Sequence, residues 1–391
     1  MFDELRYESK RWPLWRWDLN LRYIAKSLLH VPEAADAGCQ EYWSRWRTWM
    51  RARPLPARED CVTTLAAVGD LMWLRHGYGQ FLSPAVAAAM GKGRGLVANL
   101  ETPVDVQAAV RRWVFETLHY NAPPEYLDPL AALGVEVALS LCNNHALDQG
   151  PGGLARTREQ VCSRGFACLG GAGTAADAVS VITVDGVRIA LFATTFGINH
   201  GEANAPSGVP VVAFGDRVDR TDWPVVDALV QQAQALAPDI IAAVPHWGFE
   251  YEYWPDAAMR AAAIGLVQRG VDLVLGSSPH VLQPVDVFSV DGWDPRAPTQ
   301  VRRGGEPRAA VVAYSLGNFA TVMPTEACLV GGILNLGFHR EEHGALSVLP
   351  LDFTPTASVR GGAHPLAVRV HTLAELGRQS RHPSRVLPHH D

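Results

Sequence analysis

The feature that most constrains this chain is a repeated pattern in which a short apolar segment ends directly in ionisable or amide side chains. Five such segments are predicted as buried strands: residues 64–70, 96–101, 135–145, 240–248 and 271–280. Patterns typical of helices lie between several of them, over residues 123–134, 152–165, 222–238 and 256–270. This alternation indicates a layered α/β domain. Because the carboxyl ends of strands in such sheets converge on one crevice, a functional site is expected there.

The remaining strand patterns indicate a second sheet. Residues 180–184 and 188–196 flank Asp185-Gly186, which is typical of a type I′ hairpin turn. A sixth strand of the alternating pattern is predicted at residues 166–171. Further strands, without intervening helices, are predicted at residues 285–290, 309–318, 331–338 and 345–353. The predicted fold is therefore an α/β two-sheet sandwich flanked by helices.

Three regions are expected along the chain: an extension at residues 1–60, the main domain at residues 61–353, and a tail at residues 354–391 with one short helix near 372–379. Within the main domain, residues 291–308 are expected to form a surface loop. Residues 1–60 form a Trp-rich extension that holds half of the 12 tryptophans: Trp12, Trp15, Trp17, Trp43, Trp46 and Trp49. An aromatic stripe at helical spacing within residues 39–53 is predicted to pack on the main domain, with a membrane-surface or partner role as the alternative.

Composition and charge exclude several classes of protein. A formal net charge of -6 gives no electrostatic basis for nucleic-acid binding. No apolar run approaches the ~20 residues of a bilayer span, and residues 1–6 carry charge where a signal peptide would be apolar. We therefore expect a cytoplasmic protein with no nucleic-acid or membrane partner. The six cysteines show no CxxC spacing and are expected to be reduced: Cys39, Cys61, Cys142, Cys162, Cys168 and Cys328.

The polar residues at the predicted strand ends are the candidate catalytic residues. They are Asp70, Glu101, Asn144, His145, His246 and His280. Buried strands that repeatedly end in ionisable groups lose stability unless those groups serve a purpose. Imidazoles tuned by carboxylates suit proton transfer near neutral pH, and the same side chains also ligate divalent cations.

Six sequence blocks carry a resemblance to a known family. They are Gly69-Asp70-Leu71-Met72, Asn99-Leu100-Glu101, the block from Asn143-Asn144-His145 to Gly150, His246-Trp247-Gly248-Phe249-Glu250, Pro279-His280-Val281-Leu282-Gln283, and Tyr314-Ser315-Leu316-Gly317-Asn318-Phe319. Together they resemble the CapA family, named for poly-γ-glutamate capsule synthesis, within the calcineurin-like metallophosphoesterase superfamily. The resemblance covers about residues 61–353 and implies that superfamily's two-sheet sandwich.

The resemblance also implies roles in a two-metal site. Asp70 and Glu101 match the carboxylate ligands, and Asn144 matches the amide ligand. His145 matches the acid, while His246 and His280 match two imidazole ligands.

Two positions depart from the superfamily's metal-binding pattern. Met72 stands where phosphoesterases have a histidine, and a thioether is a poor ligand for hard cations. Ser277-Ser278-Pro279-His280 stands where the family usually has His-Pro-His or His-His-Pro-His. The sequence therefore favours a site without a metal cofactor. If the site does bind Mn or Zn, the predicted ligands are Asp70, Glu101, Asn144, His246 and His280.

Three functions are consistent with these residues. The first is a metal-independent peptide epimerase, similar to CapA-like proteins that act on lasso-type precursor peptides. Its substrate would be a peptide, and its partner would be a leader-peptide-binding protein. In it His145 and His280 transfer protons, Asp70, Glu101 and His246 orient them or stabilise the enolate-like intermediate, and Asn144 or Asn318 binds the substrate carbonyl. The second is a metal-dependent hydrolase of phosphoester or γ-glutamyl amide bonds. The third is a non-enzymatic factor that binds a peptide or polymer.

Further side chains are predicted to bind substrate. Arg75 suits a carboxylate, and Trp73, Glu250 and Tyr251 could line a peptide groove. Further candidates are Ser277, Ser278 and Asn318. Several of these side chains have an alternative interpretation without a substrate. The two serines could be neutral turn residues, Arg75 could lie in a solvated loop, and Glu250 and Tyr251 could belong to a loop that covers the sheet.

Overall fold

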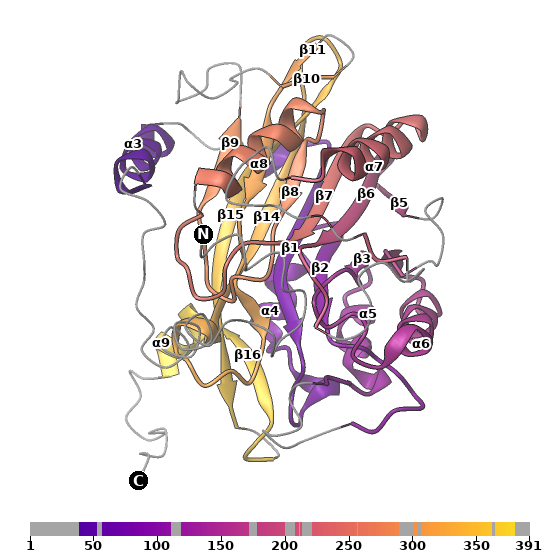
Figure 1. Cartoon of the computed structure of the whole chain (residues 1–391). Coiled ribbons are helices and arrows are strands. Elements are labelled where there is room, and N and C mark those ends of the chain that lie inside the picture. The colour runs from indigo at the N-terminus through magenta and orange to yellow at the C-terminus, as the bar shows by residue number, and fades with distance from the viewer. Residues whose placement is uncertain are drawn as a thin grey trace.

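A computed structural model of the chain describes residues 39–52, 57–110, 119–171, 178–199, 208–210, 212, 221–255, 257–288, 301–303, 306–361 and 364–379. Two mixed sheets dominate the fold, as Figure 1 shows. The predicted α/β two-sheet sandwich flanked by helices is confirmed. The expectations for residues 1–38 and 380–391 lie outside the described residues.

The first sheet contains, among the described residues, eight strands in the order β16-β15-β14-β1-β2-β3-β4, with β13 pairing to β1. Its strands are β1 (Thr63–Met72), β2 (Gly95–Glu101), β3 (Glu136–Ser140), β4 (Ala167–Leu169), β13 (Asn318–Ala320), β14 (Val330–Arg340), β15 (Leu346–Arg360) and β16 (Val368–Thr372). Strands β1 to β4 run parallel, and β14 joins β1 antiparallel. The polar ends of β1, β2 and β3 therefore lie at one edge.

The second sheet has the order β5-β6-β7-β8-β12-β9. Its strands are β5 (Val179–Val184), β6 (Val187–Thr195), β7 (Ile240–His246), β8 (Leu273–Leu275), β9 (Val285–Phe288) and β12 (Ala310–Ala313). The predicted hairpin joins β5 to β6, with Asp185 at φ 47° and Gly186 at φ 83°, as a type I′ turn requires. Strands β6, β7, β8 and β12 are parallel, so their carboxyl ends also share an edge.

Alternate side chains of the second sheet pack into different cores. Ile240 and Ala242 of β7 belong to the core shared with the first sheet, whereas Ile241 and Ala243 pack on the opposite face. Helices α7 and α8 cover that opposite face (Figure 1). This period of two places an apolar layer between the sheets and a second layer beneath the helices.

The helices are short and lie outside the sheets. The α-helices are α3 (Cys39–Ala52), α4 (Pro84–Met90), α5 (Asp128–Ala131), α6 (Gly150–Cys162), α7 (Trp223–Ala235), α8 (Ala257–Gln268) and α9 (Leu373–Gln379). The 3-10 turns are η1 (Arg58–Asp60), η2 (Tyr78–Gln80), η4 (Pro124–Leu127) and η7 (Ala327–Leu329). No helix in the described ranges has the length and hydropathy that crossing a bilayer requires.

Helix α3 contains the described part of the Trp-rich extension. Trp43 is fully buried in the core beneath α7 and α8, where its ring meets Tyr314 edge-on at 5.7 Å and stacks on Trp254 at 6.2 Å. The Tyr42 hydroxyl donates a hydrogen bond to Asp286 over 3.0 Å. These contacts hold the helix to the second sheet.

Two boundaries differ from the expectation. Strand β15 crosses residue 353 without a break and pairs with β16, so residues 354–360 and 368–372 belong to the first sheet instead of forming a tail. The strand predicted at 309–318 is divided into β12 and β13, because Gly317 at φ 67° turns the chain from one sheet to the other. Within the predicted loop 291–308, strands β10 (Val301–Arg303) and β11 (Glu306–Arg308) pair as a hairpin.

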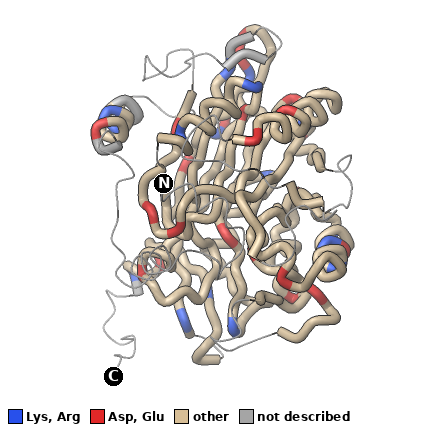
Figure 2. The backbone as a smooth tube through the Cα atoms, in the orientation of Figure 1, with Lys and Arg blue, Asp and Glu red and all other residues tan. Residues whose placement is uncertain are grey.

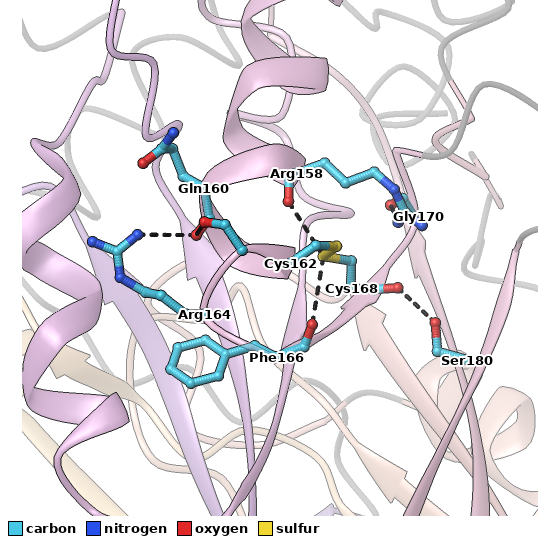
Figure 3. The surroundings of a disulfide bond; sticks show 9 residues. Arg158, Gln160, Cys162, Arg164, Phe166, Cys168, Gly170 and Ser180 are labelled. Carbon is cyan, nitrogen blue, oxygen red and sulfur yellow. Dashed lines mark hydrogen bonds between the residues drawn. A yellow bond between two sulfur atoms is a disulfide. The ribbon is translucent and has the colours of Figure 1, made fainter.

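The expectation that every cysteine is reduced is wrong for one pair. Cys162, at the end of α6, forms a disulfide with Cys168 in β4, and their Cα atoms are 6.5 Å apart (Figure 3). The turn between helix and strand brings the two together, a proximity that CxxC spacing does not reveal. Ser180 of β5 donates a hydrogen bond to the carbonyl of Cys168 over 2.7 Å, which links the same strand to the next. Cys61, Cys142 and Cys328 are free thiols.

Charged residues are spread over separate elements in Figure 2. Lys and Arg lie on α3, α6 and around β10 and β11, interspersed with Asp and Glu.

Candidate functional site

The candidate site lies where the carboxyl ends of the two sheets meet. Asp70 of β1 pairs in register with Asn99 of β2 and with Asn318 of β13. His246 ends β7 and forms a bridge with Ser277, just after β8. Gly69 makes this arrangement possible, since a Cβ atom there would lie 1.8 Å from the carbonyl oxygen of Gly317.

Three of the predicted catalytic side chains form a compact cluster. Ligand atoms of Asp70, Glu101 and His246 all lie within 4.8 Å of one another, and all three side chains are buried. Two carboxylates and an imidazole at this spacing can surround one divalent cation.

Glu101 is the least satisfied member of the cluster. Neither carboxylate oxygen has a hydrogen-bond partner, and the residue is fully buried. Burial raises the pKa of Glu101 well above its usual value, and the nearby Asp70 and Glu250 raise it further. Because an unpaired buried carboxylate is costly, this position calls for a cation or a proton.

Asp70 is held from two sides. Its Oδ1 accepts a hydrogen bond from Asn99 over 2.8 Å, and its Oδ2 accepts one from the backbone amide of Ser278 over 3.3 Å. Burial raises the pKa of Asp70, while His280, whose Nδ1 lies 3.8 Å from Oδ2, opposes that increase.

His246 is fixed through both ring nitrogens. Nδ1 lies 3.0 Å from the Ser277 hydroxyl and 3.3 Å from the Asn99 amide, and Nε2 lies 3.0 Å from Oδ1 of Asn144. Burial lowers the pKa of His246 well below its usual value, and His280 and His145 lower it further. The imidazole is therefore neutral near pH 7, as a metal ligand must be.

His145 forms a dyad with a carboxylate that the sequence interpretation did not single out. Its Nδ1 lies 2.7 Å from Oδ2 of Asp148, three residues further along the same turn. Its ring stacks on Tyr120 with centroids 3.8 Å apart, and its Nε2 lies 3.4 Å from the Asn199 amide. Asp148 can therefore orient the imidazole and stabilise its protonated form.

A directional chain of hydrogen bonds connects His246 to His145. Asn144 donates from Nδ2 to Oδ1 of Asn199 over 3.5 Å, which leaves Oδ1 of Asn144 to accept from His246. Asn199 in turn donates toward Nε2 of His145. This order places a proton on Nδ1 of His145 and on Nε2 of His246, and an ion bound at Nε2 of His246 would take the place of that second proton.

His280 lies on the other side of the cluster. Its Nδ1 donates to Oδ1 of Asn318 over 2.9 Å, and its Nε2 lies 4.0 Å from Glu250. Asn318 donates from Nδ2 to the carbonyl of Cys328, which fixes its Oδ1 as the acceptor. Both ends of Asn318 are occupied within the protein, so it positions His280 and the predicted contact with a substrate carbonyl is not favoured.

The structure brings the remaining predicted binding residues together only in part. Ser277 and Ser278 are buried and serve His246 and Asp70, and Tyr251 lies beside His280 at 6.2 Å between ring centroids. Trp73 is buried and stacks on Tyr120 at 6.1 Å. Arg75 is half-buried, and no hydrogen bond or ion pair among the described residues joins it to the cluster.

The local backbone is strained at the site. Tyr251, Ser278 and His280 adopt φ values of 67°, 99° and 60°, a region that residues other than glycine seldom occupy. Such strain collects at functional sites, where the surrounding structure holds it.

Met72 and four missed residues complete the description. The Met72 sulfur accepts a hydrogen bond from Thr321, which directly follows β13, over 3.3 Å. The sulfur is therefore engaged by the protein and is not directed at an ion. The sequence interpretation assigned no role to Asn99, Tyr120, Asp148 and Asn199. Asn99 and Asp148 stand inside the quoted blocks and could have been found there, whereas Tyr120 and Asn199 lie in loops without a signal.

The cluster fits a divalent cation, although the sequence favoured a site without one. Glu101 offers two oxygens that lack partners, His246 is neutral, and Asp70 supplies a second carboxylate. Asn144 lies against His246 and adds an amide oxygen to the donor set. These donors suit a single ion; His280 binds Asn318 through Nδ1 and keeps Nε2 for other chemistry.

Comparison with known families matches residues 64–322 to the model of the bacterial capsule synthesis protein PGA_cap. That segment spans most of the chain and includes every member of the cluster. The chain belongs to the PGA_cap family.

Two relatives of this PGA_cap protein come from Bacillus. The PGA biosynthesis protein CapA of Bacillus subtilis (strain 168) is 24% identical over 310 residues, covering 75% of this chain and 72% of the relative. The capsule biosynthesis protein CapA of Bacillus anthracis is 25% identical over 291 residues, covering 70% and 64%.

One solved structure shows a weaker similarity. It is a provisionally assigned 5′-nucleotidase from Staphylococcus aureus in complex with α-ketoglutarate, with a TM-score of 0.40, 10% sequence identity, and coverage of 75% of this chain and 54% of that chain.

Proposed function

We propose that this PGA_cap protein is a divalent-metal-dependent hydrolase of γ-glutamyl amide bonds in a poly-γ-glutamate type polymer. The observation that carries the proposal is Glu101, whose two unpartnered and buried carboxylate oxygens stand beside Asp70 and His246. Membership of a capsule synthesis family supports the class of polymer.

The proposed chemistry divides between the cluster and the dyad. Asp70, Glu101 and His246, with Asn144, would hold a divalent ion, which would supply Lewis-acid chemistry at the scissile carbonyl. His145 in its doubly protonated form, with Asp148 accepting from Nδ1, would donate the proton on Nε2 to the departing amine, which would take the place of the Asn199 amide at that nitrogen. His280 and Glu250 flank the opposite side, where a glutamyl substrate would bind.

The test uses the purified chain with γ-glutamyl-p-nitroanilide, and with bis(p-nitrophenyl) phosphate for the phosphoester reading. We expect turnover that is abolished by EDTA and restored by Mn²⁺ or Zn²⁺. Glu101→Gln should abolish it, whereas Glu136→Gln, at an exposed position where β3 begins, should not. Turnover that continues undiminished in the chelator would contradict the proposal.

A metal-independent peptide epimerase is the second candidate, and the two outer histidines favour it. His145 and His280 each donate Nδ1–H to a fixed acceptor, Asp148 and Asn318, which leaves Nε2 of each without a proton and able to act as a base. At His145 the substrate would displace the Asn199 amide from Nε2. Two such imidazoles on different sides of the cluster suit removal and return of a Cα proton. The substrate would be a ribosomally made precursor peptide, delivered with a leader-peptide-binding protein.

Deuterium separates the two candidates. An epimerase incorporates solvent deuterium at one Cα of its peptide and retains activity in EDTA, whereas the hydrolase does neither. If His145→Ala and His280→Ala both leave the biological activity intact, neither enzyme reading holds and a non-enzymatic binding factor is indicated.

A further inference from the structure

Tyr120 is a candidate-site residue with no role in the chemistry proposed above. It directly precedes Asn121, which forms reciprocal hydrogen bonds with Asp105. The Asp105 amide donates to Oδ1 of Asn121 over 2.8 Å, and Nδ2 of Asn121 donates to the Asp105 carbonyl over 3.0 Å. Arg156 of α6 binds both carboxylate oxygens of Asp105 at 2.6 Å. The position of Tyr120 is therefore set by a rigid base.

Tyr120 contacts the catalytic dyad through its ring and its backbone. The ring lies nearly parallel to that of His145, at an angle of 13° with centroids 3.8 Å apart, and Trp73 stacks near-parallel with it at 6.1 Å. The backbone amide donates to the same Asp148 oxygen that binds His145, over 2.6 Å. The Tyr120 ring is thus held in one plane beside the imidazole.

Within the part of the chain that the structure describes, the phenol hydroxyl plays no part in this anchoring. The hydrogen bonds of Tyr120 there use its backbone amide and its carbonyl, which accepts from Gln149 over 2.8 Å. Burial raises the pKa of the hydroxyl, and the charges of Glu101, Asp148 and Glu250 raise it further. The group is therefore a fixed donor that lies within the field of the carboxylates on both sides of the cluster.

We infer that the Tyr120 hydroxyl donates a hydrogen bond to an acceptor oxygen of the bound substrate, the carbonyl or carboxylate of a glutamyl unit, beside the proton that His145 delivers. This inference rests on the proposed function for the identity of the substrate. It makes Tyr120 a catalytic residue that stabilises developing negative charge where a rigid ring holds the donor in place.

The test separates the hydroxyl from the ring. Tyr120→Phe keeps the ring stacked on His145 and removes only the hydroxyl donor, whereas Tyr120→Leu removes both. The control is Tyr42→Phe, which removes a tyrosine hydroxyl that donates to Asp286 and not to a residue of the candidate site. Each protein is loaded with Mn²⁺. The readouts are metal content, kcat and KM for γ-glutamyl-p-nitroanilide, and calorimetric binding of di-γ-glutamate.

We expect Tyr120→Phe to retain its metal, to lower kcat/KM about 100-fold and to weaken di-γ-glutamate binding, while Tyr42→Phe behaves as wild type. A Phe variant equal to wild type with an impaired Leu variant would overturn the inference, since the ring alone would then matter. If the wild type turns over no substrate, the hydrolase proposal fails, and the binding of di-γ-glutamate then tests the donor role of Tyr120. Weaker binding by Tyr120→Phe than by wild type supports that role. Equal binding by the two proteins, or no binding by wild type, overturns it.

Discussion

Oε1 of Glu101 lies 3.8 Å from Nε2 of His246, and the two side chains are 0% and 1% exposed. The gap is too long for a hydrogen bond, no donor among the described residues reaches either Glu101 oxygen, and the neighbouring Asp70 carboxyl could pair with Glu101 only by sharing a proton. Because burial raises the pKa of Glu101 and lowers that of His246, neither group favours its charged form. A divalent ion between them would offset both costs, since it neutralises the carboxylate and binds the uncharged imidazole.

Asn99 is expected to support the ion without touching it. It donates to Asp70 over 2.8 Å, contacts His246 at 3.3 Å and accepts from Asn143 over 3.2 Å. We predict that Asn99→Ala lowers Mn²⁺ affinity about 10- to 100-fold, measured by calorimetry. Asn335→Ala, at a buried asparagine of the same sheet bonded to Asp352, is the matched control and should keep wild-type affinity.

The dyad of His145 and Asp148 should contribute to turnover and not to ion binding. Asp148→Asn removes the negative charge that stabilises protonated His145 while preserving the shape of the side chain. We predict a fall in kcat of about 100-fold with little change in bound metal, measured by steady-state kinetics and elemental analysis. Loss of the ion together with activity would show that this turn supports the cluster instead.

The base of the Tyr120 loop gives an expected pH dependence. Hydrogen bonds from Arg156 lower the pKa of Asp105, so the folded value lies below the unfolded one. The resulting stability is present above about pH 4 and is lost as the pH falls through the folded pKa. Arg156→Gln should therefore lower the unfolding temperature at pH 7, and the difference from wild type should shrink as the pH falls below about 4. Arg164→Gln, which breaks an exposed pair with Asp128, should show neither effect.

Helix α3 should contribute to the stability of the second sheet through one side chain. Trp43 is fully buried, whereas Trp46 beside it is only half-buried. We predict that Trp43→Ala lowers the free energy of unfolding by about 3–5 kcal/mol in urea, and that Trp46→Ala costs clearly less. Equal and small effects would mean that the extension does not pack on the domain.

Periodicity and turn chemistry predicted much of the fold. The strand ends at Asp70, Glu101 and His246 converge because parallel neighbours share an edge, and Asp185-Gly186 determines its hairpin locally. Strand β16 was missed, and a tail was predicted in its place, because β16 pairs with β15 only in the folded sheet. The disulfide was missed because a helix-to-strand turn, and no sequence motif, brings Cys162 to Cys168.

The sequence predicted which residues form the site but not which side chains contact one another. Asn318 was expected to meet substrate, yet its amide is fixed by Cys328 and its oxygen holds His280. Tyr120 and Asn199 carry no chemical signature in the sequence, because they meet His145 from loops. The departures at Met72 and Ser278 argued against a metal, whereas the unpartnered Glu101 argues for one.

Binding of Mn²⁺ to the metal-stripped full chain tests the central claim most directly. We predict that calorimetry finds one ion per chain for the wild type, and that Glu101→Gln weakens binding at least about 100-fold while Glu136→Gln does not. Wild-type protein that binds neither Mn²⁺ nor Zn²⁺, or a Glu101→Gln variant that binds as tightly as wild type, would contradict it.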